Sequence, residues 1–193
     1  MGEGPALAGL GICERASHVK SVSTDFKETM PAPDRVKELR IRPATAADRS
    51  RLIPLVNSAF SVETFLQGPR TDEERLSAAM EKGTILVAED AEGRLLASIY
   101  TELRGKHGYA GMLAVDPVHQ GGGLGRRLME AVEERFRAHG CDAVEITVLS
   151  LRPELLPIYR RFGFVETGTE PFHYPHPLAP GLECHCIVMQ KAL

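Results

Sequence analysis

The segment that decides the fold is Val115-Asp-Pro-Val-His-Gln-Gly-Gly-Gly-Leu-Gly-Arg-Arg127, which joins a predicted strand to a predicted helix through three consecutive glycines. Glycine lets the backbone adopt positive φ angles and lets a ligand approach the main chain closely. Successive backbone N–H groups in such a turn point into a concavity that suits an anion, and free N–H groups at the helix N-terminus add to it. The segment therefore predicts an anion-binding turn.

Two arginines at the start of the helix strengthen this interpretation. Arg126 and Arg127 both lie in the first turn or so of the predicted helix. Positive charge at a helix N-terminus is unfavourable by about 0.3–1 kcal/mol for each side chain. A local rule that is broken twice indicates a compensating anion, and a pyrophosphate would supply it.

The spacing of the glycines distinguishes between kinds of pyrophosphate site. The dinucleotide pattern G-x-G-x-x-G fails, because Arg126 or Leu128 stands where its last glycine belongs, and no P-loop lysine follows. The pattern Q/R-x-x-G-x-G/A is met by Gln120, Gly123 and Gly125. The segment closely resembles the coenzyme A pyrophosphate signature of the GNAT superfamily, the acyl-CoA-dependent N-acyltransferases. A glycine-rich loop without a ligand is the alternative that the turn alone leaves open.

A second motif lies downstream, in the sequence LLPIYRRFGF at residues 155–164. It resembles the later signature of the superfamily, a short helix that carries a tyrosine and is followed by Gly-Phe. The motif departs from the family at two positions, because Arg152 and Leu155 stand where many members carry asparagine and alanine. The two motifs, in this order, extend the resemblance to roughly residues 39–193.

The resemblance implies how the residues share the chemistry. In the superfamily a backbone N–H of the cofactor strand polarises the thioester carbonyl, and Gly111 in that strand indicates a bulge or a close backbone approach. Tyr159 matches the general acid of the family, since a phenol of pKa ~10 can protonate a thiolate whose conjugate acid has a pKa of about 8.5–10. The implied cofactor contacts are Leu113, Ala114, Val115, Gln120, Gly121, Gly122, Gly123, Leu124, Gly125, Arg126, Arg127 and Arg152.

The general base is less clear from the sequence. An alkylamine is mostly protonated at pH 7, so a group must remove its proton before attack. Glu145 alternates with Thr147 along one face of a predicted strand, and related enzymes place a base at the position of Thr147. We rank Glu145 first and Glu63 second, with Tyr109 and Glu102 as further candidates. For each carboxylate, a solvent-exposed surface position is the ordinary alternative.

The hydrophobic pattern predicts a single α/β domain over residues 38–193. Three strands in a row, followed by alternation of helices and strands, indicate a mixed central sheet with helices packed on it. The family resemblance implies the GNAT fold, in which about four helices flank this sheet. Gly, Pro, Ser and Thr are frequent in residues 1–37, and no sustained hydrophobic period of a strand or a helix appears there. We therefore expect a flexible extension. The predicted strands span 39–42, 84–89, 95–103, 109–115, 144–149, 164–167 and 184–189, and the predicted helices start at Thr45, at a Thr71–Glu74 capping box, near Leu124 and near Glu154.

The composition limits the classes of partner that are expected for this protein. The net charge of −3 gives no reason to expect nucleic acid or an anionic membrane, and no run approaches the ~18 apolar residues of a membrane span. The four cysteines form no disulfide framework, and targeting patterns fail at the N-terminus, so a cytoplasmic location is expected. His-x-x-His from His173 and Cys-x-Cys from Cys184 could ligate zinc, but cysteines so spaced on a strand usually pack, and no metal is expected.

The expected activity is transfer of an acetyl or other short acyl group from acetyl-CoA to a primary amine. The acceptor is expected to be a small molecule, and residues 61–70 and 167–183 are expected to determine which one. Three alternatives stay open: a protein N-terminal acetyltransferase, a catalytically silent acyl-CoA-binding module and a zinc-stabilised interaction domain. A homodimer is also open.

Overall fold

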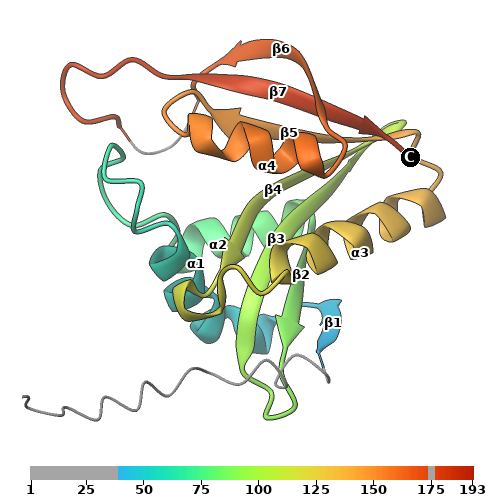
Figure 1. Cartoon of the computed structure of the whole chain (residues 1–193). Coiled ribbons are helices and arrows are strands. Elements are labelled where there is room, and N and C mark those ends of the chain that lie inside the picture. The colour runs from blue at the N-terminus through green and yellow to red at the C-terminus, as the bar shows by residue number, and fades with distance from the viewer. Residues whose placement is uncertain (1–38, 174–176) are drawn as a thin grey trace, which may run out of the picture. The chain divides into compact units, whose positions relative to one another are not determined.

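A seven-stranded mixed sheet forms the centre of the computed structural model, which describes residues 39–173 and 177–193 (Figure 1). The spatial order is β1-β2-β3-β4-β5-β7-β6, and every neighbouring pair is antiparallel except β4 and β5. The predicted mixed sheet is therefore confirmed. The strands are β1 (Arg40–Pro43), β2 (Thr84–Glu89), β3 (Leu95–Arg104), β4 (His107–Val115), β5 (Ala143–Leu149), β6 (Val165–Pro171) and β7 (His185–Ala192).

Four α-helices of the described residues cover the two faces of this sheet, as predicted. They are α1 (Arg49–Ala59), α2 (Glu73–Lys82), α3 (Leu124–Ala138) and α4 (Leu156–Arg161). The buried side chains of α1 and α2 form one apolar cluster with alternate residues of β2 and β3, whereas α3 and α4 pack into a second cluster on the other face. Figure 1 shows α3 and α4 in front of the sheet, and α2 lies behind it.

The long helix α3 follows the predicted amphipathic pattern. Leu128, Val132 and Phe136 are fully buried, and Gly140 stands just beyond the helix with a φ of 73°. A Cβ atom at Gly108 of β4 would lie 2.3 Å from the ring of Phe136. Only glycine at that position lets the helix pack this closely on the strand.

The start of α2 differs from the prediction by one residue. Asp72, not Thr71, is the N-cap, and its carboxylate accepts a hydrogen bond from the backbone N–H of Arg75 at 2.9 Å. The backbone N–H of Thr71 is instead bonded to the side chain of Asn57 in α1, at 2.9 Å. This contact buries Thr71 between the two helices, which a capping pattern read along the chain cannot show.

Two further boundaries carry information for the site. The helix around Tyr159 begins irregularly, with a 3-10 helix at Pro153–Leu155 before α4 and Pro157 in the first turn of α4. β6 extends to Pro171, beyond the predicted end at residue 167, because its backbone pairs with β7 while its side chains stay exposed. No helix in the described part of the chain is long and apolar enough to cross a membrane. The extension predicted for residues 1–37 lies outside the described residues.

Candidate active site

The parallel strands β4 and β5 diverge in the middle of the sheet. They pair only from His107 with Ala143 to Ala110 with Ile146, although both strands continue for several residues. Beyond the last pair, the facing backbone edges have no partner strand among the described residues. We call this divergence the fork. Its backbone N–H groups are available to a ligand that enters between the strands.

A β-bulge in β4 accompanies the fork. The register between β3 and β4 shifts, so that Met112 and Leu113 together oppose Ile99. Met112 has a φ of 49°, the only positive φ at a non-glycine position of the described chain. Gly111 stands directly before the bulge, and a Cβ there would lie 2.8 Å from the hydroxyl of Tyr109. The irregularity predicted from this glycine is therefore present, and it bends β4 at the fork.

The glycine turn, residues 120–127, connects the end of β4 to α3. Gly121 and Gly123 have φ angles of 78° and 81°, and Gly123 is the N-cap of α3. No side chain caps this N-terminus, so the first N–H groups of the helix remain open for an anion. The amide Nε2 of Gln120 donates to the carbonyl oxygen of Val115 at 3.1 Å, which ties the turn to the strand.

One cleft of about 570 Å³ connects the fork, the glycine turn and α4. Its wall also includes Phe60 and Arg70 from the segment between α1 and α2, which the sequence analysis did not count as site residues. The predicted residues that line the cleft are Glu63, Tyr109, Leu113, Val115, Gln120, Gly121, Gly123, Leu124, Gly125, Arg126, Arg152 and Tyr159. The predicted residues that do not line it are Glu102, Ala114, Gly122, Arg127 and Glu145.

Tyr159 is placed in the cleft wall by α4. Its ring makes edge-on contacts with Phe162 and Phe164, with ring centroids 6.2 and 6.0 Å apart. Phe164 is fully buried, so it anchors the tyrosine against the core. The aromatic packing fixes the ring of Tyr159, which lines the cleft.

Glu145 lies on β5 before the fork opens, outside the cleft. Its carboxylate accepts a hydrogen bond from Nε2 of Gln190 at 3.0 Å and lies 3.7 Å from the guanidinium of Arg104. Two residues further along, Thr147 does line the cleft, and its hydroxyl is 3.1 Å from that of Tyr109. The alternation along the strand was correct, but the opening begins after Glu145.

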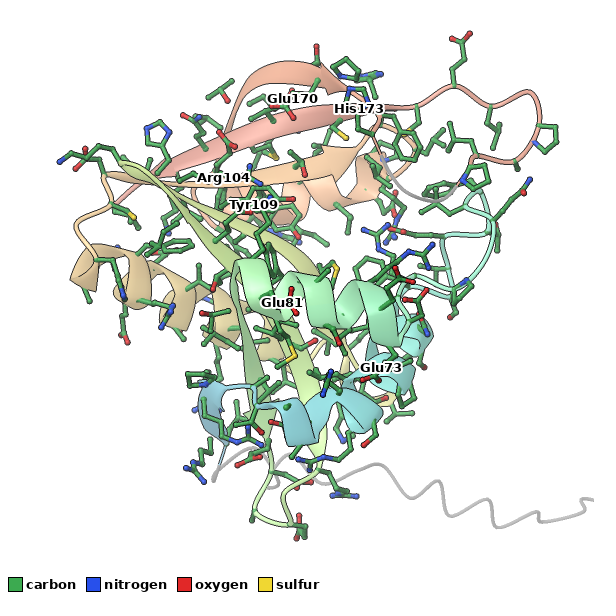
Figure 2. The ribbon with its side chains drawn as sticks, turned by 180° about the vertical axis from the view of Figure 1, so that it is seen from behind. Glu73, Glu81, Arg104, Tyr109, Glu170 and His173 are labelled. Carbon is green, nitrogen blue, oxygen red and sulfur yellow. The ribbon has the colours of Figure 1, made fainter. Side chains whose placement is uncertain are left out.

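Tyr109 is held at the fork from the side of α2. The guanidinium carbon of Arg104 lies 4.0 Å from the centre of the tyrosine ring, and Figure 2 shows the two side chains together at the middle of the sheet.

A second tyrosine, Tyr100, lies on the neighbouring strand β3. Burial and the nearby carboxylate of Glu102 raise the pKa of Tyr100 to about 12. Tyr100 therefore stays protonated near neutral pH.

A buried cluster of Glu63, Arg70 and Arg152 forms another part of the cleft wall, and we call it the arginine–glutamate cluster. Oε1 of Glu63 accepts a hydrogen bond from Nη1 of Arg152 at 2.9 Å, and Oε2 lies 3.4 Å from Nη1 of Arg70. The exposed fractions of the three side chains are 5%, 6% and 17% for Glu63, Arg70 and Arg152. Arg152, at the position where the family pattern has asparagine, thus pairs with Glu63.

The two predicted specificity loops meet at this end of the cleft. Leu66 and Leu178 form an isolated β-bridge, and the backbone N–H of Ala179 donates to the carbonyl oxygen of Phe65 at 2.9 Å. Figure 1 shows the two loops side by side. No three His, Cys, Asp or Glu side chains within 39–173 and 177–193 come together as a metal site, and His176 lies outside these ranges.

Comparison with known proteins identifies the family. Residues 55–173 match the acetyltransferase (GNAT) domain model. Glucosamine 6-phosphate N-acetyltransferase 1 of rice, Oryza sativa subsp. japonica, is 34% identical over 146 residues, which cover 68% of this chain and 84% of the relative. A mycothiol acetyltransferase of Beutenbergia cavernae is 38% identical over 80 residues, which cover 41% of this chain but only 27% of the relative.

The fold agrees with these matches. A GNAT family acetyltransferase of Elizabethkingia anophelis, whose structure has acetyl-CoA bound, superposes with a TM-score of 0.65 at 18% identity, over 81% of this chain and 99% of that one. At this identity the likeness concerns the fold alone. Taken with the domain match and the rice relative, it leads to one conclusion: the chain belongs to the GNAT family of acetyltransferases.

Proposed function

We propose that this protein transfers an acetyl group from acetyl-CoA to a primary amine on a small molecule, by direct attack of the amine on the thioester. The observation that carries the proposal is the single cleft that joins the fork, the glycine turn and Tyr159. These are the three parts that such a reaction needs: a phosphate site, a polarising N–H and a proton donor.

The glycine turn has the chemistry of a pyrophosphate site. The left-handed conformations of Gly121 and Gly123 direct consecutive N–H groups to one side, and the N-terminus of α3 adds its own. A Cβ at either glycine would meet nothing within 4 Å, so open space lies where a ligand would approach. Arg126 lines the cleft beside them and supplies positive charge. The residues present therefore fit coenzyme A.

The fork supplies the polarising group. Leu113 and Val115 line the cleft beyond the last β4–β5 pair, where backbone N–H groups point to the gap between the strands. An N–H directed at the thioester oxygen stabilises the negative charge that develops there when the amine attacks. Because the bulge at Met112 fixes this stretch of β4, the donor needs little reorganisation during the reaction.

Tyr159 would protonate the departing thiolate. As the C–N bond forms and the C–S bond breaks, the sulfur takes the phenolic proton, and the proton released by the amine restores the phenol through solvent. Of the two carboxylates ranked from the sequence, Glu63 lines the cleft whereas Glu145 does not. The geometry therefore favours Glu63 over Glu145 as the group that helps to remove the amine proton.

The relatives support a small acceptor. The rice relative, which matches over 68% of this chain, is named for an amino sugar phosphate, and the mycothiol acetyltransferase is likewise named for a small molecule.

The test is a panel of primary amines, with the free thiol of coenzyme A as the readout. We expect thiol release from acetyl-CoA that depends on the amine and saturates with it, together with an acetylated product of the corresponding mass. Thiol release that is the same with and without every amine would indicate slow hydrolysis in an acyl-CoA-binding module and would overturn the proposal.

A further inference from the structure

The arginine–glutamate cluster is not explained by acetyl transfer alone. Glu63 and Arg70 lie in the segment between α1 and α2, and Arg152 precedes α4, so the chain brings them together from distant positions. All three line the cleft and are largely buried. Burying charges is unfavourable unless they are paired, and replacing such a cluster with apolar residues is often neutral for stability. A buried charged wall in a binding cleft therefore indicates recognition of a charged ligand.

The described residues of this cluster carry more positive than negative charge. It contains two guanidinium groups and one carboxylate, which leaves one positive charge in excess among the described cluster residues. Arg152 has a second carboxylate partner in Glu154, but 59% of that side chain is exposed and it does not line the cleft. Solvent screens such an exposed charge, so the field inside the cleft is set by the buried groups.

The arginines are held in fixed orientations. The guanidinium carbon of Arg70 lies 4.6 Å from the centre of the Phe60 ring, and the hydrogen bond from Arg152 to Glu63 orients the second guanidinium. A guanidinium that is already oriented loses little side-chain entropy when it binds, and its planar array of donors matches carboxylate and phosphate oxygens. The wall thus has the chemistry and the rigidity of an anion subsite.

We propose that Arg70 and Arg152 bind an anionic group, a carboxylate or a phosphate, on the acceptor amine. Glu63 holds the two guanidinium groups in place and partly neutralises them in the absence of the acceptor. The inference rests on the proposed function and adds the class of acceptor: small molecules that carry both a primary amine and an anion.

The first experiment measures selectivity between matched acceptors. β-Alanine is compared with β-alaninamide, and phosphoethanolamine with ethanolamine, so that each pair differs mainly in the anion. We expect kcat/KM to favour the anionic member by about 10- to 100-fold, which corresponds to ~1.4–2.8 kcal/mol. The pair with the larger ratio distinguishes a carboxylate site from a phosphate site. Equal use of the charged and neutral members in both pairs would overturn the inference.

Arginine variants show whether the cluster causes the selectivity. Arg152→Gln and Arg70→Gln should reduce the ratio towards one, while the melting shift produced by acetyl-CoA stays as in the unaltered protein. The matched control is Arg94→Gln, which removes an exposed guanidinium from the β2–β3 hairpin, outside the cleft, and should retain the ratio. Unchanged selectivity in both cluster variants would contradict the assignment.

A substitution of Glu63 should affect binding of the anionic acceptor in the direction opposite to the arginine substitutions. Glu63→Gln keeps the shape but removes the carboxylate that competes for the two arginines, so KM for the anionic acceptor should fall. A purely structural ion pair would instead make KM rise or leave it unchanged. Any role of Glu63 in proton removal affects kcat, so the two roles are read from different parameters.

Anion binding can be measured without turnover. With the protein saturated by coenzyme A, which occupies the glycine turn, inorganic phosphate and acetate are titrated while the melting temperature is recorded. This experiment applies even if none of the tested acceptors is acetylated. A saturable shift of the melting temperature that is lost in Arg70→Gln and Arg152→Gln supports the anion subsite. The same shift in the unaltered protein and in both variants overturns it. Failure of acetyl-CoA itself to stabilise the protein would be a failure of the proposed function, and it is seen separately.

Discussion

Single residues of the cleft combine packing with chemistry, and Tyr159 is the case in which the two can be separated. Tyr159→Phe keeps the ring contacts with Phe162 and Phe164 but removes the phenolic proton. We expect kcat to fall by about 10²–10⁴-fold, the usual contribution of general acid–base assistance. Steady-state kinetics and acetyl-CoA titration measure the two effects, and the affinity for acetyl-CoA should hardly change.

Tyr100→Phe is the matched control for this change. Tyr100 lies on the neighbouring strand, donates a hydrogen bond to Glu102 and does not line the cleft. Its loss should leave kcat close to that of the unaltered protein. If Tyr159→Phe changes only KM, the tyrosine binds a substrate; if nothing changes, the thiolate takes its proton from water or from the amine.

Among single residues, the sequence predicted those that belong to local motifs better than those whose role depends on a partner far away in the chain. Tyr159 and the glycines were predicted as site residues because local patterns define them. The partner of Arg152 could not be found, because Glu63 is 89 positions away and only the folded cleft brings the pair together. Glu145 was ranked first because strand alternation predicts the face of a residue, but it does not predict where two strands separate.

The entry to α1 is the element whose stability depends most clearly on charge. Asp48 is buried, and its hydrogen bonds with Arg42 hold the pKa of the carboxyl well below its usual range. The same arginine lowers the pKa of Glu89 on β2. Thr45 and Asp48 also form a capping box at the 3-10 helix Ala46–Asp48, directly before α1, so the cluster joins the helix start to the edge of the sheet.

The pH dependence of stability follows from these shifts. A carboxyl whose folded pKa lies below its unfolded value of about 4 stabilises the protein above that value, and the contribution is lost as pH falls. We expect the free energy of unfolding to decrease below about pH 5, and Asp48→Asn to remove about 3 kcal/mol at pH 7 and flatten the acid decrease. Urea unfolding at several pH values measures both effects.

The exposed carboxylate of Glu92 gives the control, because Glu92→Gln should shift the midpoint only slightly. If the free energy of unfolding decreases as steeply with acid in Asp48→Asn as in the unaltered protein, the role of this cluster is contradicted.

Helices and strands with strong hydrophobic periodicity, such as α3 and β2, were predicted with nearly correct bounds. The length of β6 was not predicted correctly, because the exposed side chains of this strand show no hydrophobic pattern. Only its backbone pairing with β7 defines where the strand ends.

At the scale of the whole molecule, the seven-stranded sheet and its helices are formed by residues within 39–173 and 177–193. We predict that a chain shortened to begin at Glu38 keeps its melting temperature within a few degrees. Residues 1–37 lack the apolar periodicity needed to offset the entropy of ordering them. Thermal unfolding of the shortened and full chains is the measurement, and a large decrease would show that the segment packs on the domain.

The order of elements, the mixed sheet and the place of the glycine turn could all be predicted from sequence, since each depends on short-range pattern or on two spaced motifs. The arginine–glutamate cluster and the extent of the fork depend on long-range packing, and no local pattern reports them. The pairing of Glu63 with Arg70 and Arg152 was therefore seen only in the structure, whereas the glycine turn was predicted from the sequence.

The central claim is that acetyl-CoA binds at the glycine turn, and calorimetric titration tests it most directly. Gly123→Glu places a negative side chain in the proposed pyrophosphate site, whereas Gly93→Glu makes the same substitution at a similar positive φ, in the β2–β3 hairpin. We predict saturable acetyl-CoA binding by the unaltered protein and by Gly93→Glu, with stabilisation of about 2.7 kcal/mol at a hundredfold excess over Kd, and none by Gly123→Glu. Undiminished binding by Gly123→Glu, or stabilisation by NAD but not by acetyl-CoA, would contradict the account.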